Sequence, residues 1–339
     1  MVIIAIIGTM LLVPDSKEVD APALDWPGLG LSIAVITALI LTIIEAPEWG
    51  WVSRNTTLGF GAAVALMVAF ISWELRSRHP MLPVRIFTNR RFSAASISIM
   101  SAFFALFGFI FLVTQYFQLI QGYSLLEAGV RTLPVAFAIA ISSIVAPRVV
   151  GRMGTTRVVT TGLSLMAMSF TWISTVSAMT GYGTIVGQMI LLGGGLGLTT
   201  APATESIMGS LSVDKAGVGS AVNDTTREMG GTLGVAVVGS VFSSVYISAL
   251  RDSEVVAELP AEARVLTEES VGAASVVAAD LGAAAPAYLA EVSDAFFSGF
   301  GVACLVMAGV AVAGAVFAAR YLPATDLDTA SKLDTGSVA

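Results

Sequence analysis

The sequence has little charge, one cysteine and one histidine. Only 12% of its 339 residues are charged, about half of the ~25% that is usual in a soluble domain. The single cysteine, Cys304, has no partner in the chain, which excludes an intramolecular disulfide and a cysteine-based metal site. The single histidine, His79, excludes zinc sites built on paired histidines and argues against a histidine-based catalytic triad. We interpret His79 as a solvated loop residue.

Apolar residues, in contrast, make up 55% of the chain, and the mean hydropathy is +0.85. Several apolar runs reach the ~18 residues of a membrane-spanning helix and carry few or no charges. These runs are apolar on all sides, so they lack the polar face of a helix in a soluble domain. The sequence therefore predicts an all-α fold, that of a polytopic helical membrane protein. Soluble enzymes and disordered chains are excluded.

Eight stretches are long enough to cross a bilayer as helices. They cover roughly residues 27–45, 57–75, 95–117, 130–147, 157–178, 183–204, 228–249 and 296–319. Residues 1–13 are also apolar but too few to cross ~30 Å of hydrocarbon at ~1.5 Å per residue. They lack the basic flank and cleavage pattern of a secretory signal. We interpret them as the end of a further span, and we expect the chain to begin inside a larger protein.

Arginines gather in two loops that lie two spans apart. The first basic loop contains Arg76, Arg78, Arg85, Arg90 and Arg91, and the second basic loop contains Arg148, Arg152 and Arg157. Cationic loops are retained on the cytoplasmic side of a membrane. We therefore expect both loops and the C-terminus to be cytoplasmic, in a chain that spans the cytoplasmic (inner) membrane.

Acidic residues gather in one segment, residues 251–294. This segment has nine acidic residues and two arginines, which accounts for the whole net charge of −7. The low isoelectric point therefore describes one external loop and no substrate. Its alanine-rich, acid-spaced pattern predicts one or two short amphipathic helices at the outer surface. Either a solvated linker or a lid is compatible with this pattern.

Four features point to one family. They are QYFQLIQGYSLLEAGVRTLP at residues 115–134, PRVVGRMGTTRVV at residues 147–159, the segment from TTAPATESIMG to GVAVVGSV at residues 199–241, and a pair of spans followed by six more. In these features the chain, from Phe92 to about Leu250, resembles the fourteen-span drug:proton antiporter branch of the major facilitator superfamily. The second segment is similar to the cytoplasmic loop motif of that superfamily, but it lacks the usual acidic residue.

The resemblance implies a domain organisation and an activity. Residues 1–13 would end the first half of a transporter, residues 14–91 would hold two inserted spans and a cytoplasmic loop, residues 92–320 would form the six-span C-terminal half, and residues 321–339 would be a disordered cytoplasmic tail. The implied activity is proton-coupled efflux of amphipathic drugs or metabolites by alternating access. The implied partners are membrane lipid, protons, small amphipathic substrates and the missing N-terminal half, without a cofactor, a metal, nucleic acid or an enzymatic reaction. The alternative is a half-transporter or regulatory subunit that needs a separately made N-terminal half.

Glu205 and Asp224 are the candidate residues for proton coupling. Ionisable groups at membrane depth are costly, so each suggests a function. A buried carboxylate can take up and release protons near neutral pH, and the resembling family has an acid at the place of Glu205. The alternative for Glu205 is an acid at the membrane interface or a hydrogen-bonding group between helices.

The gate candidates are charged side chains near the membrane surfaces. Asp224, Arg227 and Glu228 stand at i, i+3 and i+4, so we expect them to pair on one helix face. They would form either a cytoplasmic anchor or a gate that opens when the pairs break. Arg131, four residues after Glu127, is either a structural anchor or an external gate. The second basic loop sets the topology or, by the resemblance, acts as a hinge and interlock.

The candidates for a substrate cavity lie in the aromatic span 95–117 and just beyond it. They are Phe107, Gln115, Tyr116 and Gln118. Aromatic rings can bind flat apolar cations through their faces, and the alternative is that these side chains face lipid or pack between helices. The glycines predicted to let helices approach closely are Gly193, Gly194, Gly195, Gly230, Gly231 and Gly234. Those at 193–195 lack the Lys-Ser/Thr that follows a phosphate loop, so no nucleotide site is expected.

Overall fold

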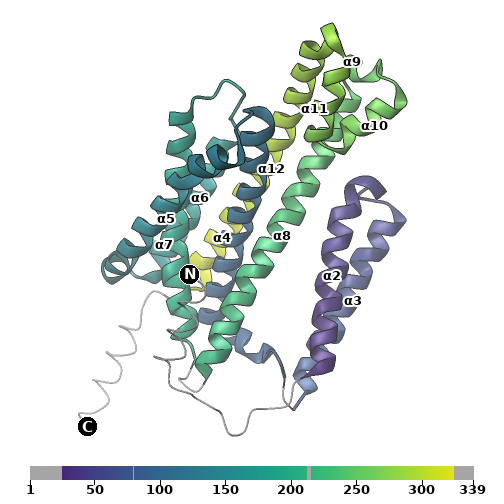
Figure 1. Ribbon diagram of the computed structural model, residues 1–339. Helices are drawn as coiled ribbons and strands as arrows, with labels where there is room; N and C mark the ends of the chain where they lie inside the picture. Colours follow the sequence, from purple (N-terminus) through teal and green to yellow (C-terminus); the bar gives the residue numbers. More distant parts are fainter. Residues whose placement is uncertain (1–24, 79, 212–214, 324–339) are drawn as a thin grey trace, which may run out of the picture.

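The computed structural model describes residues 25–78, 80–211 and 215–323, and these ranges are helical without any strand. The eight long helices are α2 (Trp26–Trp49), α3 (Arg54–Arg76), α4 (Arg90–Gln115), α5 (Leu125–Met153), α6 (Thr155–Ile173), α7 (Tyr182–Met208), α8 (Ala216–Arg251) and α12 (Ala285–Tyr321). Each helix contains or overlaps one predicted span. The predicted all-α membrane fold is therefore confirmed (Figure 1). The expected partial span 1–13 and most of the expected tail lie outside the described residues.

Seven of these eight helices are long and apolar enough to cross a membrane, whereas the sequence predicts eight spans. The exception within the described ranges is α6. Its 19 residues would reach ~28 Å, but they include Arg157 and many threonines and serines, which lower the hydropathy. Because α6 packs along both α7 and α12, its place in the bundle agrees with a span although its composition is less apolar.

Both basic loops lie at the same end of the helix bundle. Residues 80–89 and the turn between α5 and α6 lie at this end, and the acidic segment lies at the opposite end (Figure 1). Thr156 Oγ1 donates a hydrogen bond to the Leu322 carbonyl (2.6 Å), which places the end of α12 beside the second basic loop. The alternation of basic and acidic ends thus follows the sequence pattern. The assignment of the basic end to the cytoplasm stays a prediction.

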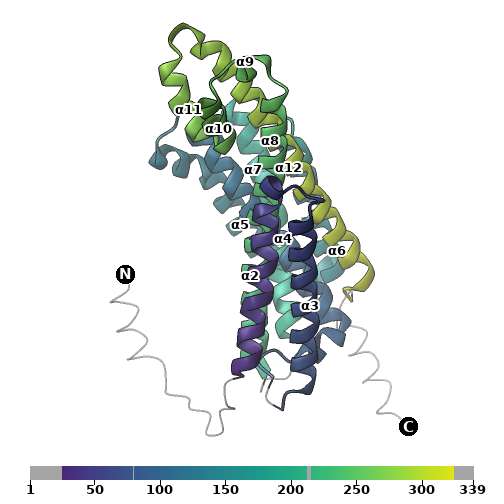
Figure 2. The ribbon, with the colours of Figure 1, turned by 90° about the vertical axis from the view of Figure 1, so that its right-hand side faces the viewer.

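The helices α2 and α3 form an antiparallel hairpin beside the bundle (Figures 1 and 2). Gly50 ends α2 with a φ of 88°, a conformation that favours glycine, and Ser53 caps α3 by accepting the Thr56 amide (3.2 Å). The hairpin packs on the bundle mainly through α2 and α8. Ser240 donates a hydrogen bond to the Ile43 carbonyl, and Trp51 Nε1 donates one to Ser244 Oγ (2.9 Å). The hairpin therefore has a defined docking position on α8.

Glycines set the closest helix contacts within the bundle. A Cβ at Gly230 would lie 2.5 Å from the Met100 carbonyl of α4, and a Cβ at Gly193 would lie 2.5 Å from the Val135 carbonyl of α5. Three more predicted packing glycines also face a neighbouring helix: Gly195 against Gly162 of α6, Gly231 against the Phe107 ring and Gly234 against the Phe104 carbonyl. Gly194 differs from the prediction, because a Cβ there would meet no atom within 4 Å. Gly194 is therefore not at a close contact between helices.

The acidic segment is a folded cap. It forms α9 (Glu254–Ala257), α10 (Ala261–Glu269), α11 (Val271–Asp280) and the short helix η4 (Gly282–Ala284) before α12 begins. Val256, Thr267 and Val277 are buried in it. The Thr267 hydroxyl is hydrogen-bonded to the Tyr288 hydroxyl (2.7 Å), and Tyr246 donates to the Thr267 carbonyl (3.1 Å). The solvated-linker interpretation is therefore wrong, because the apolar side chains between the acids are spaced to bury one another.

Thr267→Val is expected to loosen this cap without unfolding the bundle. Valine keeps the shape of threonine but removes the hydroxyl that joins α10 to α12, and one such buried hydrogen bond contributes about 1.4 kcal/mol. Hydrogen exchange of the amides of α10 and α11 should accelerate by about tenfold. The Thr57→Val control, at an exposed position of α3, should leave these rates unchanged. Equal rates in the wild type and Thr267→Val would contradict the assigned role.

Candidate functional site

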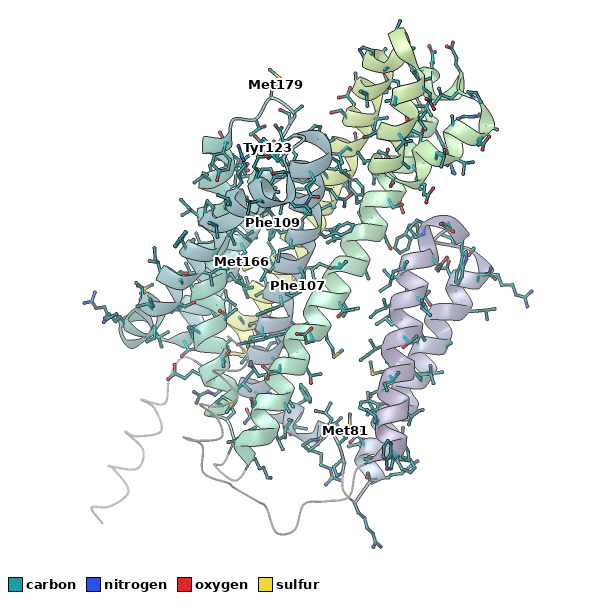
Figure 3. The ribbon with its side chains drawn as sticks, viewed as in Figure 1. Met81, Phe107, Phe109, Tyr123, Met166 and Met179 are labelled. Carbon is teal, nitrogen blue, oxygen red and sulfur yellow. The ribbon has the colours of Figure 1, made fainter. Side chains whose placement is uncertain are left out.

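Two carboxylates of α8 face a cavity between the hairpin and the bundle. The cavity has a volume of about 790 Å³, and both Asp224 and Glu228 line it. The rest of its wall is mainly apolar and comes from α2, α3 and α8, with Met81 and Leu82 at the basic end. Figure 3 shows Met81 at the base of the hairpin. A charged pair on an otherwise apolar wall suits a ligand that is both apolar and cationic.

A second hollow continues along the same side of α8. It has a volume of about 560 Å³ and is lined by Glu228, Phe107, Phe111 and Glu48, among others. We call the two cavities together the α8 groove. Phe107 lies beside α8 in Figure 3, and its ring contacts Gly231. Glu228 lines both parts of the groove, so it lies at their junction.

Arg227 does not pair with its two acidic neighbours. Its Nη2 donates to Thr204 Oγ1 of α7 (2.9 Å), and its guanidinium carbon lies 5.3 Å from the centre of the Phe103 ring of α4. Thr204 Oγ1 in turn lies 3.4 Å from Asn223 Oδ1. Within the part of the chain that the structure describes, no ion pair joins Arg227 to Asp224 or Glu228. The predicted local pairing is wrong, because the long arginine side chain reaches between α4 and α7 while the carboxylates face the groove.

The two candidates for proton coupling lie on different helices. Asp224 belongs to the groove. Glu205 is exposed on α7, beside Thr204, and does not line either part of the groove. The structure thus does not bring Glu205 into the groove with Asp224. A role of Glu205 in coupling stays a prediction.

Of the four candidates for a substrate cavity, only Phe107 lines the groove. Tyr116, at the start of the π-helical segment η2 (Tyr116–Ile120), is 2% exposed. Its ring packs 6.1 Å from both Phe297 and Phe300 of α12, measured between ring centres. Tyr116 therefore packs between helices, which is the alternative to a cavity role, and it does not line the groove. Gln115 and Gln118 are half-buried, and neither lines the groove.

Arg131 forms an aromatic clamp at the acidic end of the bundle. Its guanidinium carbon lies 3.8 Å from the centre of the Tyr123 ring and 5.9 Å from that of Tyr182 on α7. The Tyr182 hydroxyl donates to the Arg131 carbonyl (3.1 Å). Glu127 is instead part of a capping box with Ser124 at the start of α5. Arg131 therefore joins α5 to α7 through tyrosines, and Figure 3 shows Tyr123 at this end.

The second basic loop stays on the surface. Arg148, Arg152 and Arg157 are all exposed, and Arg148 makes only a long hydrogen bond to the Ile144 carbonyl (3.5 Å). In the described ranges no three metal-ligating side chains lie together. Sequence reasoning missed Glu74 of α3, which is buried within a predicted span. The rule that singled out Glu205, that acids at membrane depth are costly, would also have singled out Glu74.

Comparison with known proteins identifies relatives of this chain. The family model described as Major Facilitator Superfamily matches residues 1–235. The chain is 32% identical over 326 residues to the tetracenomycin C resistance and export protein of Streptomyces glaucescens, covering 93% of this chain. It is 30% identical over 312 residues to the multidrug efflux pump LfrA of Mycolicibacterium smegmatis, covering 90% of this chain. It is also 30% identical over 236 residues to the multidrug resistance protein Stp of Mycobacterium tuberculosis, covering 70% of this chain.

The chain spans only part of the length of these relatives. The aligned region covers 60% of the tetracenomycin C protein, 61% of LfrA and 44% of Stp.

Proposed function

The chain belongs to the major facilitator superfamily, and from that premise we propose that it is part of a proton-coupled exporter of amphipathic drugs or metabolites. In this proposal α2 and α3 are the two inserted spans and α4 to α12 are the second half of a fourteen-span protein. The first half completes the transport pathway. The protein lies in the cytoplasmic membrane with its basic end and C-terminus on the cytoplasmic side. Family membership favours a transporter over an enzyme.

The α8 groove is the observation that carries the proposal. A cavity of about 790 Å³ is within the usual size of a small-molecule site. Its apolar wall removes the apolar part of a ligand from water, and Asp224 and Glu228 attract a cationic part. Neither carboxylate has an ion-pair partner among the described residues. Each is therefore available to a cation or to a proton.

Competition between the proton and the cationic ligand for these carboxylates would couple proton entry to substrate export. When Asp224 or Glu228 binds a proton, its negative charge disappears and a cationic ligand is held less tightly. A proton that enters from outside would thus release the substrate, and loss of that proton on the inner side would restore the site. The two halves of the transporter would rock around the site so that it opens to one side at a time.

The test is export by the intact transporter that contains this chain. At ethidium concentrations well below saturation, we expect the double variant Asp224→Asn, Glu228→Gln to export ethidium about fivefold more slowly than the wild type, because each lost charge weakens binding by about 0.5 kcal/mol. Both substitutions keep the size of the side chain. Ethidium efflux from loaded, drug-sensitive cells measures the rate.

The matched control is Glu45→Gln, which removes one acid from α2 at a position that does not line the groove. It should export at the wild-type rate. A double variant that exports ethidium as fast as the wild type, at equal expression in the membrane, would remove the groove from the transport pathway.

A further inference from the structure

A second pair of carboxylates is buried at the base of the α2–α3 hairpin. Asp25 precedes α2 and Glu74 lies in the last turn of α3, and the two residues are 8% and 3% exposed. A Cβ placed on Gly28 would lie 2.7 Å from Asp25 Oδ2 and 2.8 Å from Glu74 Oε1. Both oxygens therefore lie over the same face of Gly28. Only the absence of a side chain at Gly28 leaves room for the two carboxylates to approach each other.

The two carboxylates are unequally supplied with hydrogen-bond donors. Asp25 Oδ1 accepts the Gly28 amide (2.9 Å) and Trp73 Nε1 (2.9 Å), and Oδ2 also lies 3.1 Å from Trp73 Nε1. These bonds, from Gly28 first and then from Trp73, hold the pKa of Asp25 below its usual value. Glu74 Oε2 accepts the Leu82 amide (3.2 Å), but Oε1 is buried without a hydrogen-bond partner. Asp25 is thus stabilised as an anion, whereas Glu74 Oε1 lies over the same face of Gly28 as Asp25 Oδ2 and has no hydrogen-bond donor.

No basic side chain of the described residues compensates for the pair. Arg76, Arg78 and Arg85 are the charged residues at this end of α3 and in the segment that follows, and all are exposed without a hydrogen bond to either carboxylate. The charged residues of α8 that line the groove are the acids Asp224 and Glu228, and Arg227 of the same helix is turned toward α7. His79 lies outside the described residues. Two buried anions in contact would repel each other strongly, and one bound proton removes this cost.

We propose that Asp25 and Glu74 form a proton-binding site, in which Glu74 Oε1 carries the proton and donates a hydrogen bond to Asp25 Oδ2. This bond gives a partner to the one buried oxygen of the pair that has none. The proton comes from solvent at the basic end and returns there, so no other reactant takes part. The ligand of the site is the proton alone.

The site controls a wall of the α8 groove. Glu74 Oε2 accepts the Leu82 amide and so holds the start of the segment that leads to α4. Met81 and Leu82 also line the groove. When the proton leaves, repulsion between the two carboxylates loosens the segment between α3 and α4. This consequence for transport rests on the proposed function, whereas the proton site itself does not.

Trp73 provides a local probe, because its indole donates directly to Asp25. In a full-length chain whose other four tryptophans are replaced by phenylalanine, we expect its emission to titrate between about pH 5 and about pH 10. Glu74→Gln should reduce the amplitude at least fivefold, because glutamine donates a permanent hydrogen bond to Asp25. Asp25→Asn should reduce it as well. His79→Gln and Glu45→Gln are the controls and should keep the wild-type titration.

Infrared spectroscopy of the same proteins tests for the bound proton directly, including the case in which the tryptophan emission does not change with pH. The wild type should show a protonated carboxylic acid band at neutral pH that Glu74→Gln lacks. A flat emission curve with this band present still supports the site, since the proton is then held throughout the range. An unchanged titration in Glu74→Gln, or the absence of the band together with a flat curve, would overturn the proposal. Neither measurement depends on drug export, so failure of the transport proposal would leave this result intact.

Discussion

Gly195→Ala is expected to destabilise the protein strongly, whereas Gly194→Ala, one residue earlier on the same helix, is expected to be harmless. A Cβ at Gly195 would collide with the Gly162 carbonyl of α6 and would lie 2.8 Å from Met166 Cγ. A Cβ at Gly194 would meet nothing within 4 Å. The two variants add the same methyl group to the same helix. Any difference between them therefore reports the contact between α6 and α7.

The size of the effect follows from what would have to move. The obstacle at Gly195 is main-chain carbonyl oxygen, which cannot turn away as a side chain can, so α6 and α7 must separate along their whole contact. Overpacking of this kind costs up to about 3 kcal/mol. Alanine at Gly194 should be neutral or stabilise the helix by a few tenths of a kcal/mol, since it removes backbone freedom from the unfolded chain.

Thermal unfolding in detergent, followed by size-exclusion chromatography of the remaining folded protein, measures both variants against the wild type. The midpoint should fall by about 6 °C or more for Gly195→Ala and should stay within ~1 °C for Gly194→Ala. Equal midpoints would show that α6 and α7 are not in close contact at this glycine.

Much of the fold could be predicted from the sequence because lipid imposes a simple rule. A segment must stay apolar for the thickness of the bilayer, so the length of each run fixes the existence of each helix. The ends were less predictable. For example, α8 begins at Ala216 rather than near residue 228. A helix can continue beyond the membrane because its backbone groups are hydrogen-bonded within the helix itself. The folded structure of the cap in residues 251–294 could not be predicted either, because its stability comes from contacts such as that of Tyr246 with Thr267, which no local pattern reveals.

The site was less predictable than the fold. Spacing places Asp224, Arg227 and Glu228 on one side of α8, but it does not say which neighbour each side chain reaches. That choice is made by Thr204 and Phe103, which belong to other helices. The groove depends on the docking of α2 through Ser240 and Trp51, a contact between segments about two hundred residues apart. Local sequence carries no information on such a contact.

Arg227→Gln is expected to raise the affinity of the exporter for cations, which is the opposite of the effect of losing a groove carboxylate. Arg227 carries a positive charge on the same turn of α8 as Asp224 and Glu228, although it is turned toward α7. Its charge opposes a bound cation by about 0.5 kcal/mol, comparable to the attraction of one groove carboxylate. Its removal should therefore tighten cation binding about twofold.

Tighter binding should slow export rather than accelerate it. A substrate that is held more firmly before the conformational change leaves more slowly, so the half-saturating concentration of ethidium and its maximal efflux rate should fall together. Glutamine can still donate to Thr204, which separates the charge from the hydrogen bond. Efflux rates measured over a range of ethidium concentrations test this, with the exposed Arg157→Gln as the control for lost positive charge. If Arg227→Gln left the half-saturating concentration at the wild-type value, the cation would bind outside the field of this arginine, and the α8 groove would not be its site.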